Sequence, residues 1–127
     1  MKKYIALLSA CCLSFCLCGC EEEGKPEDMP QQFYDTCVAF CETVDDVVVG
    51  DITCEEAEMK FKRQEEVFKI YEKKKDNYSG DTYYLAISCV HKANFAQIDV
   101  GLGDFSEKEI ENLIEYRDDI AERINLD

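Results

Sequence analysis

The spacing of apolar residues constrains the fold of this chain more than any other feature. From about residue 29 onward, apolar side chains recur every three or four residues, which is the period of an amphipathic helix. No segment of useful length alternates apolar and polar residues as a half-buried strand would. The pattern therefore predicts an all-α fold.

Four helices are predicted, over about residues 29–48, 53–75, 81–98 and 106–124. Thr53 and Glu56 have the spacing of a capping box, and Ser106 and Glu109 repeat it at the last helix. Asp81 is expected to cap the third helix. Four helices of similar length with short connections predict an antiparallel up-and-down bundle.

The third predicted helix is apolar on two sides. One stripe consists of Tyr84, Ile87, His91, Phe95 and Ile98, and the other consists of Leu85, Cys89, Ala93 and Ala96. A helix with two apolar sides is typically buried on both of them. We therefore expect this helix to be the most buried of the four.

The N-terminal segment has the composition of an export signal. Lys2 and Lys3 precede an apolar run, Tyr4 to Leu17, that is too short to span a bilayer stably. The sequence Leu17-Cys18-Gly19-Cys20 resembles the bacterial lipobox, in which an aliphatic residue and two small residues precede an obligatory cysteine. The resemblance implies that the signal peptidase cleaves before Cys20 and that Cys20 carries a diacylglycerol thioether.

The lipobox resemblance divides the chain into a signal peptide (residues 1–19), the lipidated Cys20 with a flexible acidic tether (20–29), and the helical domain (30–127). It implies a lipid-anchored protein of the bacterial envelope, whose domain lies outside the cytoplasm and whose first partner is the bilayer. Glu21 stands where the inner-membrane retention signal of enterobacterial lipoproteins has Asp. The outer membrane is therefore favoured if the host has two membranes.

Charge restricts the partners of the mature domain. Cleavage before Cys20 leaves 108 of the 127 residues and removes two lysines, so that 12 basic and 28 acidic residues give a net charge of −16. Such a surface repels nucleic acid and anionic lipid headgroups and attracts a basic protein. Solubility and spacing from the membrane explain the charge equally well, so both interpretations stay open.

Four cysteines remain in the exported domain, and an even number predicts two disulfides. Cys37 and Cys41 lie one helical turn apart, with Cβ atoms about 5–6 Å from each other, which is too far for a disulfide. Their expected heights along the bundle favour Cys37–Cys89 with Cys41–Cys54. The swapped pairing remains the alternative.

The sequence predicts no enzyme, no cofactor and no metal site. His91 is the only histidine, and no nucleophile motif, phosphate-binding loop, zinc signature or calcium loop accompanies it. The Cys37 and Cys41 pair on one helix face is the basis of one alternative, a carrier that binds copper or zinc through thiols and His91.

The predicted function is therefore a non-enzymatic protein-binding module, and a purely structural envelope lipoprotein is a further alternative. Two classes of small lipoprotein are similar to this description by analogy only. They are pilotins, which bind a helix of a secretin, and immunity or exclusion lipoproteins. The expected binding site is a groove bordered by three tyrosines, with two aspartates setting specificity. These residues are Tyr34, Tyr83, Tyr84, Asp35 and Asp81. The alternative, that the tyrosines simply close the bundle, stays open.

Overall fold

The computed structural model describes residues 25–26, 28–74, 80–102 and 106–126. Within these ranges it contains no strand and the following four helices: α2 (Gln31–Val48), α3 (Cys54–Glu72), α4 (Gly80–Gly101) and α5 (Glu107–Arg123). The predicted all-α class is confirmed. The predicted signal peptide, Cys20 and most of the tether lie outside the described residues.

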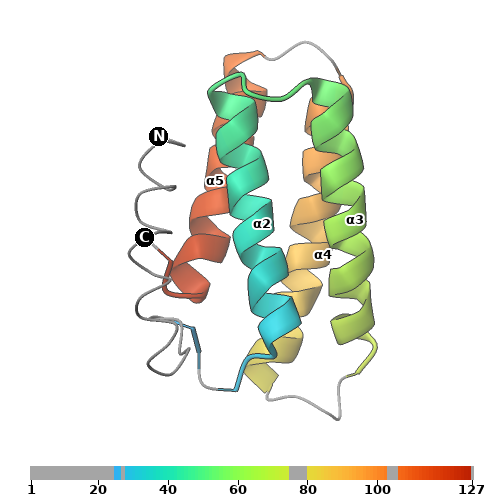
Figure 1. The fold of residues 1–127 in the computed structure, drawn as a ribbon, viewed down its shortest axis with the longest axis vertical. Coiled ribbons are helices and arrows are strands. Elements are labelled where there is room, and N and C mark those ends of the chain that lie inside the picture. Colours follow the sequence, from blue (N-terminus) through green and yellow to red (C-terminus); the bar gives the residue numbers. More distant parts are fainter. Residues whose placement is uncertain (1–24, 27, 75–79, 103–105, 127) are drawn as a thin grey trace, which may run out of the picture.

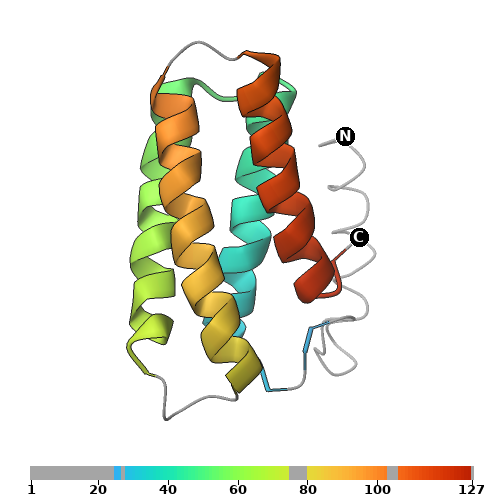
Figure 2. The ribbon, with the colours of Figure 1, turned by 180° about the vertical axis from the view of Figure 1, so that it is seen from behind.

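The helices run alternately up and down along the long axis of the molecule (Figure 1). Each helix packs against two others, in the order α2, α3, α4, α5 and back to α2. The α3–α4 interface is the most extensive, and the α4–α5 interface is the least extensive of these four. Seen from behind, α4 and α5 lie side by side (Figure 2). Among the described helices, none combines the length and the apolar character needed to cross a membrane.

The beginnings of the helices match the predicted signals only in part. At α3 the capping box is complete, with N···O distances of 3.1 Å from Glu56 to the Thr53 hydroxyl and 3.0 Å from Thr53 to the Glu56 carboxylate. Ser106 is the N-cap of α5, but its side chain makes no capping hydrogen bond. The prediction that Asp81 caps α4 is wrong, because the helix already includes Gly80 and Asp81 lies in its first turn.

The core contains two kinds of surface that fit each other. Helices α2 and α3 contribute large rings, with Phe33 and Phe68 centroids 5.7 Å apart and Phe40 and Phe61 centroids 5.2 Å apart. Helix α4 instead presents small residues, Ala86, Cys89, Ala93 and Ala96, all fully buried. Small side chains let α4 approach α3 closely, and aromatic rings fill the space between the helices.

Candidate protein-binding groove between α4 and α5

The two apolar stripes of α4 differ in their burial. The stripe of Leu85, Cys89, Ala93 and Ala96 is buried in the core. In the other stripe, Tyr84 is 66% exposed, Phe95 49% and Ile98 54%, and His91 is exposed as well. The prediction that α4 is the most buried of the four helices is wrong, because its main contacts are with α3 and α5 and none of the described helices covers its outer side.

Helices α4 and α5 meet in a regular antiparallel register. The Lys92 ammonium lies 2.9 Å from the Asp119 carboxylate. One turn along α4, the Phe95 ring lies 6.4 Å from the Tyr116 ring. A further turn along, Asp99 accepts hydrogen bonds from Tyr116 and from Asn112. Each step forward on α4 is thus matched by an equal step back on α5, which is the packing of neighbouring antiparallel helices.

An open groove of about 850 Å³ follows this interface. Its α4 wall contains Ser88, His91, Lys92 and Phe95, and its α5 wall runs from Glu111 to Arg123 with Ile114 as its exposed aliphatic residue. Four carboxylates of the α5 wall recur with helical spacing and are exposed. They are Glu111, Glu115, Asp118 and Glu122. Phe95 is thus the apolar residue of the α4 wall, and an acidic stripe of α5 lies across the groove from it.

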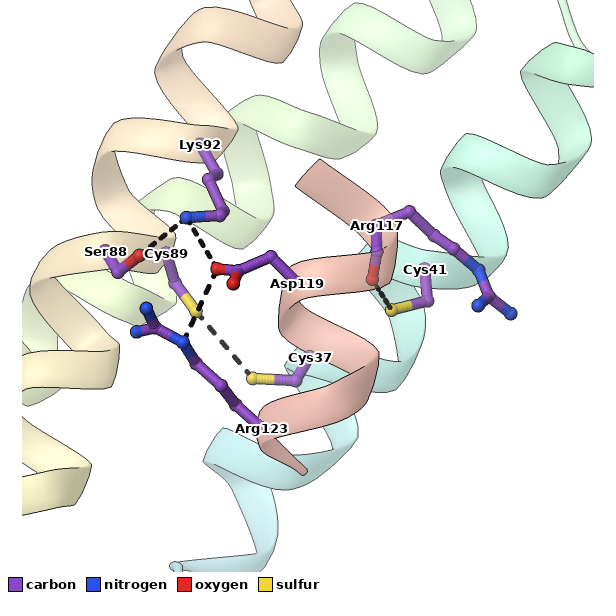
Figure 3. Close-up of polar contacts among 8 residues, drawn as sticks. All are labelled: Cys37, Cys41, Ser88, Cys89, Lys92, Arg117, Asp119 and Arg123. Atoms are coloured by element: carbon purple, nitrogen blue, oxygen red, sulfur yellow. Dashed lines mark hydrogen bonds and ion pairs between the residues drawn. The ribbon is translucent and has the colours of Figure 1, made fainter. Parts of the chain in front are cut away.

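The basic residues of the groove are both engaged by one carboxylate (Figure 3). Asp119 Oδ2 lies 2.9 Å from Lys92 Nζ and 3.4 Å from Arg123 Nε. Lys92 also donates a hydrogen bond of 2.7 Å to the Ser88 hydroxyl. Glu111, Glu115 and Glu122 make no ion pair with any described residue. The groove therefore keeps a negative rim.

A half-buried polar cluster lies where α4 ends and α5 begins. Burial raises the pKa of Asp99, and the charge of Glu109 adds to this shift, while the hydrogen bonds from Tyr116 and Asn112 oppose it. Burial and the adjacent Asp99 raise the pKa of Tyr116 to about 12. At neutral pH the Tyr116 hydroxyl therefore keeps its proton and remains a donor to Asp99.

The cysteines form no disulfide in the described structure, so the two predicted disulfides are not supported. Cys37 and Cys89 are both buried, and their sulfur atoms lie 4.0 Å apart, well beyond the length of an S–S bond (Figure 3). The Cys41 thiol faces α5 and donates to the carbonyl of Arg117 at 3.6 Å. Cys54 lies partly exposed at the start of α3. Cys41 therefore points toward a different helix from the one that carries its predicted partner.

The buried thiols are poor nucleophiles and poor metal ligands. Burial raises the pKa of Cys37 well above its usual value, and the adjacent Cys89 thiol raises it further. Burial also raises the pKa of Cys41 to about 12, although the Arg117 guanidinium opposes the shift. Metal binding and nucleophilic attack both need the thiolate. Within the described ranges, no three His, Cys, Asp or Glu side chains are grouped as metal ligands.

The structure brings only some residues of the sequence-predicted groove together, at the beginning of α4. Tyr34 is buried with 5% exposure, whereas Tyr83 is half-buried and its ring lies tilted against that of the exposed Tyr84, with ring centroids 5.4 Å apart. Asp35 borders a shallow hollow between α2 and α3. Asp81 and Tyr84 border another hollow at the N-terminal end of α4.

Sequence reasoning missed the α4–α5 groove, although two signals for it were present. The second apolar stripe of α4 exceeded what one core face requires, and the carboxylates of α5 recurred with helical spacing. Only the register of the two helices places these stripes side by side. The chain matches no protein-family model, no curated protein and no solved structure.

Proposed function

We propose that this protein is a lipid-anchored, non-enzymatic protein-binding module of the bacterial envelope and that it binds its partner in the α4–α5 groove. The observation that carries the proposal is the exposed apolar stripe of α4 beside the groove. Phe95 and Ile98 are each about half exposed, although burial of such side chains is favourable by about 1.5–3 kcal/mol each. Contiguous exposed apolar surface with a polar rim is typical of interaction sites.

The anchor proposal rests on the lipobox resemblance of residues 17–20. The described part of the tether is compatible with it, because Met29 is buried in the core just before α2 and Lys25 donates to its carbonyl at 3.3 Å. The chain thus joins the bundle at the end where α2 and α4 both begin (Figure 1). An outer-membrane location is part of this proposal for a host with two membranes.

Two roles of small lipoproteins remain candidates. A pilotin grips a helix of a secretin, and an immunity or exclusion lipoprotein neutralises a toxin or blocks an entering system. The acidic rim of the groove favours a basic partner, which suits the immunity role slightly better. The metal-carrier alternative has less support, because Cys37, Cys41 and Cys89 are buried.

We also propose that Cys37 and Cys89 form a disulfide in the oxidising envelope. Their sulfurs are already adjacent, so bond formation needs a small approach of α2 and α4. The exchange would take place while the chain folds, before burial protects the thiols, and the two thiols would lose two protons and transfer two electrons to the disulfide of an envelope thiol–disulfide oxidoreductase. Cys41 stays reduced in this account because its thiol faces α5.

The anchor is tested by the substitution Cys20→Ala. Loss of the acylated cysteine should abolish labelling with a fatty-acid analogue and should move the protein out of the membrane fraction or leave it unprocessed. A conservative control is Cys18→Ala, which keeps a small residue in the lipobox. A Cys20→Ala protein that is processed and fractionates like the wild type would show that the chain carries no lipid anchor.

The binding surface is tested by site-specific photo-crosslinking in the native envelope. A photoreactive amino acid is placed at Ile98, which is exposed one helical turn from Phe95 in the groove wall, and the same amino acid at Met59 on α3 is a control with 51% exposure. We expect one discrete adduct from position 98 and none from position 59. The proposed function fails if position 98 gives no adduct or if both positions give the same adducts.

A further inference from the structure

We infer that the occupant of the α4–α5 groove is a basic amphipathic helix of the partner protein. This inference rests on the proposed function and names the chemistry of its partner. Three properties of the groove support it: its shape, the exposed apolar side chains in its walls and its acidic rim.

The shape of the groove fits a helix laid along it. Two antiparallel helices in regular register form parallel ridges, and a third helix packs into the furrow between such ridges. The α5 wall extends from Glu111 to Arg123, which corresponds to about 18 Å of helix. A partner helix of three to four turns covers this length. Binding of an amphipathic helix in an apolar groove is a common mode of peptide recognition.

Apolar side chains from both walls of the groove supply the central contacts. Phe95 and Ile114 line the groove from opposite helices, and Ile98 lies one turn along α4 from Phe95. Phe95 is 49% exposed and Ile114 is 38% exposed, so each has apolar surface left to bury. A partner helix with leucine-like residues at positions i, i+3 and i+7 would cover these side chains with one face.

The acidic rim sets the charge of the partner. Glu111, Glu115 and Glu122 lie along the exposed edge of α5. The groove's own cations do not neutralise them, because Lys92 and Arg123 both contact Asp119. Lysine or arginine residues that flank the apolar face of the partner helix would pair with these glutamates. Complementary charge raises both the rate and the specificity of association.

Charge also disfavours the other occupants of such a groove. A second copy of this chain would place an identical acidic stripe against the first, and the protein carries a net charge of −14. Anionic lipid headgroups would be repelled in the same way. A basic amphipathic helix is the occupant that both neutralises the charge of the acidic rim and buries the exposed apolar side chains of the groove.

A synthetic peptide tests the inference directly. The probe is a peptide of about 16 residues with leucines on one helical face, lysines on the other, and a single tryptophan among the leucines. The protein contains no tryptophan, so emission excited at the red edge reports on the peptide alone. We expect a blue shift and saturable binding for this peptide. A peptide with glutamate in place of every lysine should not bind.

Matched variants locate the binding site. The pair Phe95→Ala and Ile114→Ala should weaken binding of the basic peptide at least about tenfold. The pair Met59→Ala and Ile70→Ala is the control, since both side chains are exposed on α3. Circular dichroism should show the same helix content in all variants.

The charge contribution has its own matched control. Three glutamates of the rim are changed together: Glu111→Gln, Glu115→Gln and Glu122→Gln. Three exposed glutamates of α3 are changed in the control: Glu55→Gln, Glu58→Gln and Glu66→Gln. Both triple variants lose the same net charge. Only the rim variant should lose about tenfold in affinity and show a weaker salt dependence.

Three results would overturn the inference. Equal losses in the two triple variants would mean that the acidic protein attracts the peptide without a site. Equal affinity for the lysine and glutamate peptides would show that the charge of the rim does not select the occupant. Self-association that disappears in the Phe95→Ala and Ile114→Ala variant would identify a second copy as the occupant. If the rim variant still gives the adduct from position 98, the proposed function stands and only the basic helix is wrong.

Discussion

The α2–α3 half and the α4–α5 half of this bundle are built in different ways. Helices α2 and α3 meet through buried rings and through buried hydrogen bonds, such as the one of 3.0 Å from the Gln64 amide to the Thr43 hydroxyl. Helices α4 and α5 are joined near the surface by the ion pair of Lys92 with Asp119, and they leave Phe95 about half exposed. This difference agrees with the proposal that the first half stabilises the fold and the second half presents the binding surface.

Truncation of large side chains should show the largest difference between the halves. Phe40→Ala removes a fully buried ring that contacts Phe61, and it should lower the free energy of unfolding by about 3–5 kcal/mol. Phe95→Ala should cost less than about 1 kcal/mol, because this ring is half exposed. Urea denaturation measures both. Similar costs would mean that the outer face of α4 is a structural surface.

Oxidation should connect the two halves covalently. A disulfide between Cys37 and Cys89 closes a long loop and should stabilise the fold by about 4 kcal/mol in the chain-entropy model. After refolding in the presence of oxidised glutathione, peptide mapping should recover Cys37 linked to Cys89, and Cys41 should remain alkylatable after unfolding. A recovered link between Cys41 and Cys54 would instead require α2 to rotate away from its contact with α5.

Polar contacts provide a finer comparison. Thr43→Val removes the hydroxyl that accepts from Gln64 and leaves a buried amide without this partner, so it should cost about 1–2 kcal/mol. Lys92→Met breaks the ion pair with Asp119 across α4 and α5 and should cost less than about 1 kcal/mol. Thermal unfolding of the two variants tests this order. A larger cost for Lys92→Met would contradict the assignment of stability to the α2–α3 half.

The smallest expected effect is a pH dependence from Asp99. Because burial raises the pKa of Asp99 in the folded protein, its stabilising contribution is complete below the ordinary pKa and is lost as pH rises through the folded value. The effect of Asp99→Asn on the free energy of unfolding should therefore be more stabilising at pH 7 than at pH 3. The difference between the two pH values should be less than about 1 kcal/mol. Melting temperatures of variant and wild type at both pH values measure it. The opposite sign would show that Asp99 is stabilised as the carboxylate.

The sequence predicted the fold better than the site. The number of helices and most core positions follow from local spacing, as at Phe33, Phe61 and Phe68, because a buried helix face must repeat every 3.6 residues. Local spacing cannot decide which apolar stripe of α4 is buried. That choice depends on packing, since Ala93 and Ala96 fit closely against α3 and Phe95 does not.

The errors at the candidate site have the same physical origin. Tyr34 was expected at a groove because a phenol can pack its ring and keep its hydroxyl wet, yet its position next to Phe33 on α2 buries it. The real groove depends on the register between α4 and α5, which brings Phe95 beside Tyr116. Register is a property of two helices together, so the sequence of either helix alone does not specify it.

We propose that the partner binds to the α4–α5 half and not to the α2–α3 half. Amide NMR spectra of the ¹⁵N-labelled protein, titrated with the basic amphipathic peptide, test this proposal. We expect chemical-shift changes concentrated at the groove, at His91, Phe95, Ile114 and Glu115, with little change around Met59 and Ile70 on α3. Shift changes centred on the exposed face of α3, with the groove unaffected, would contradict it.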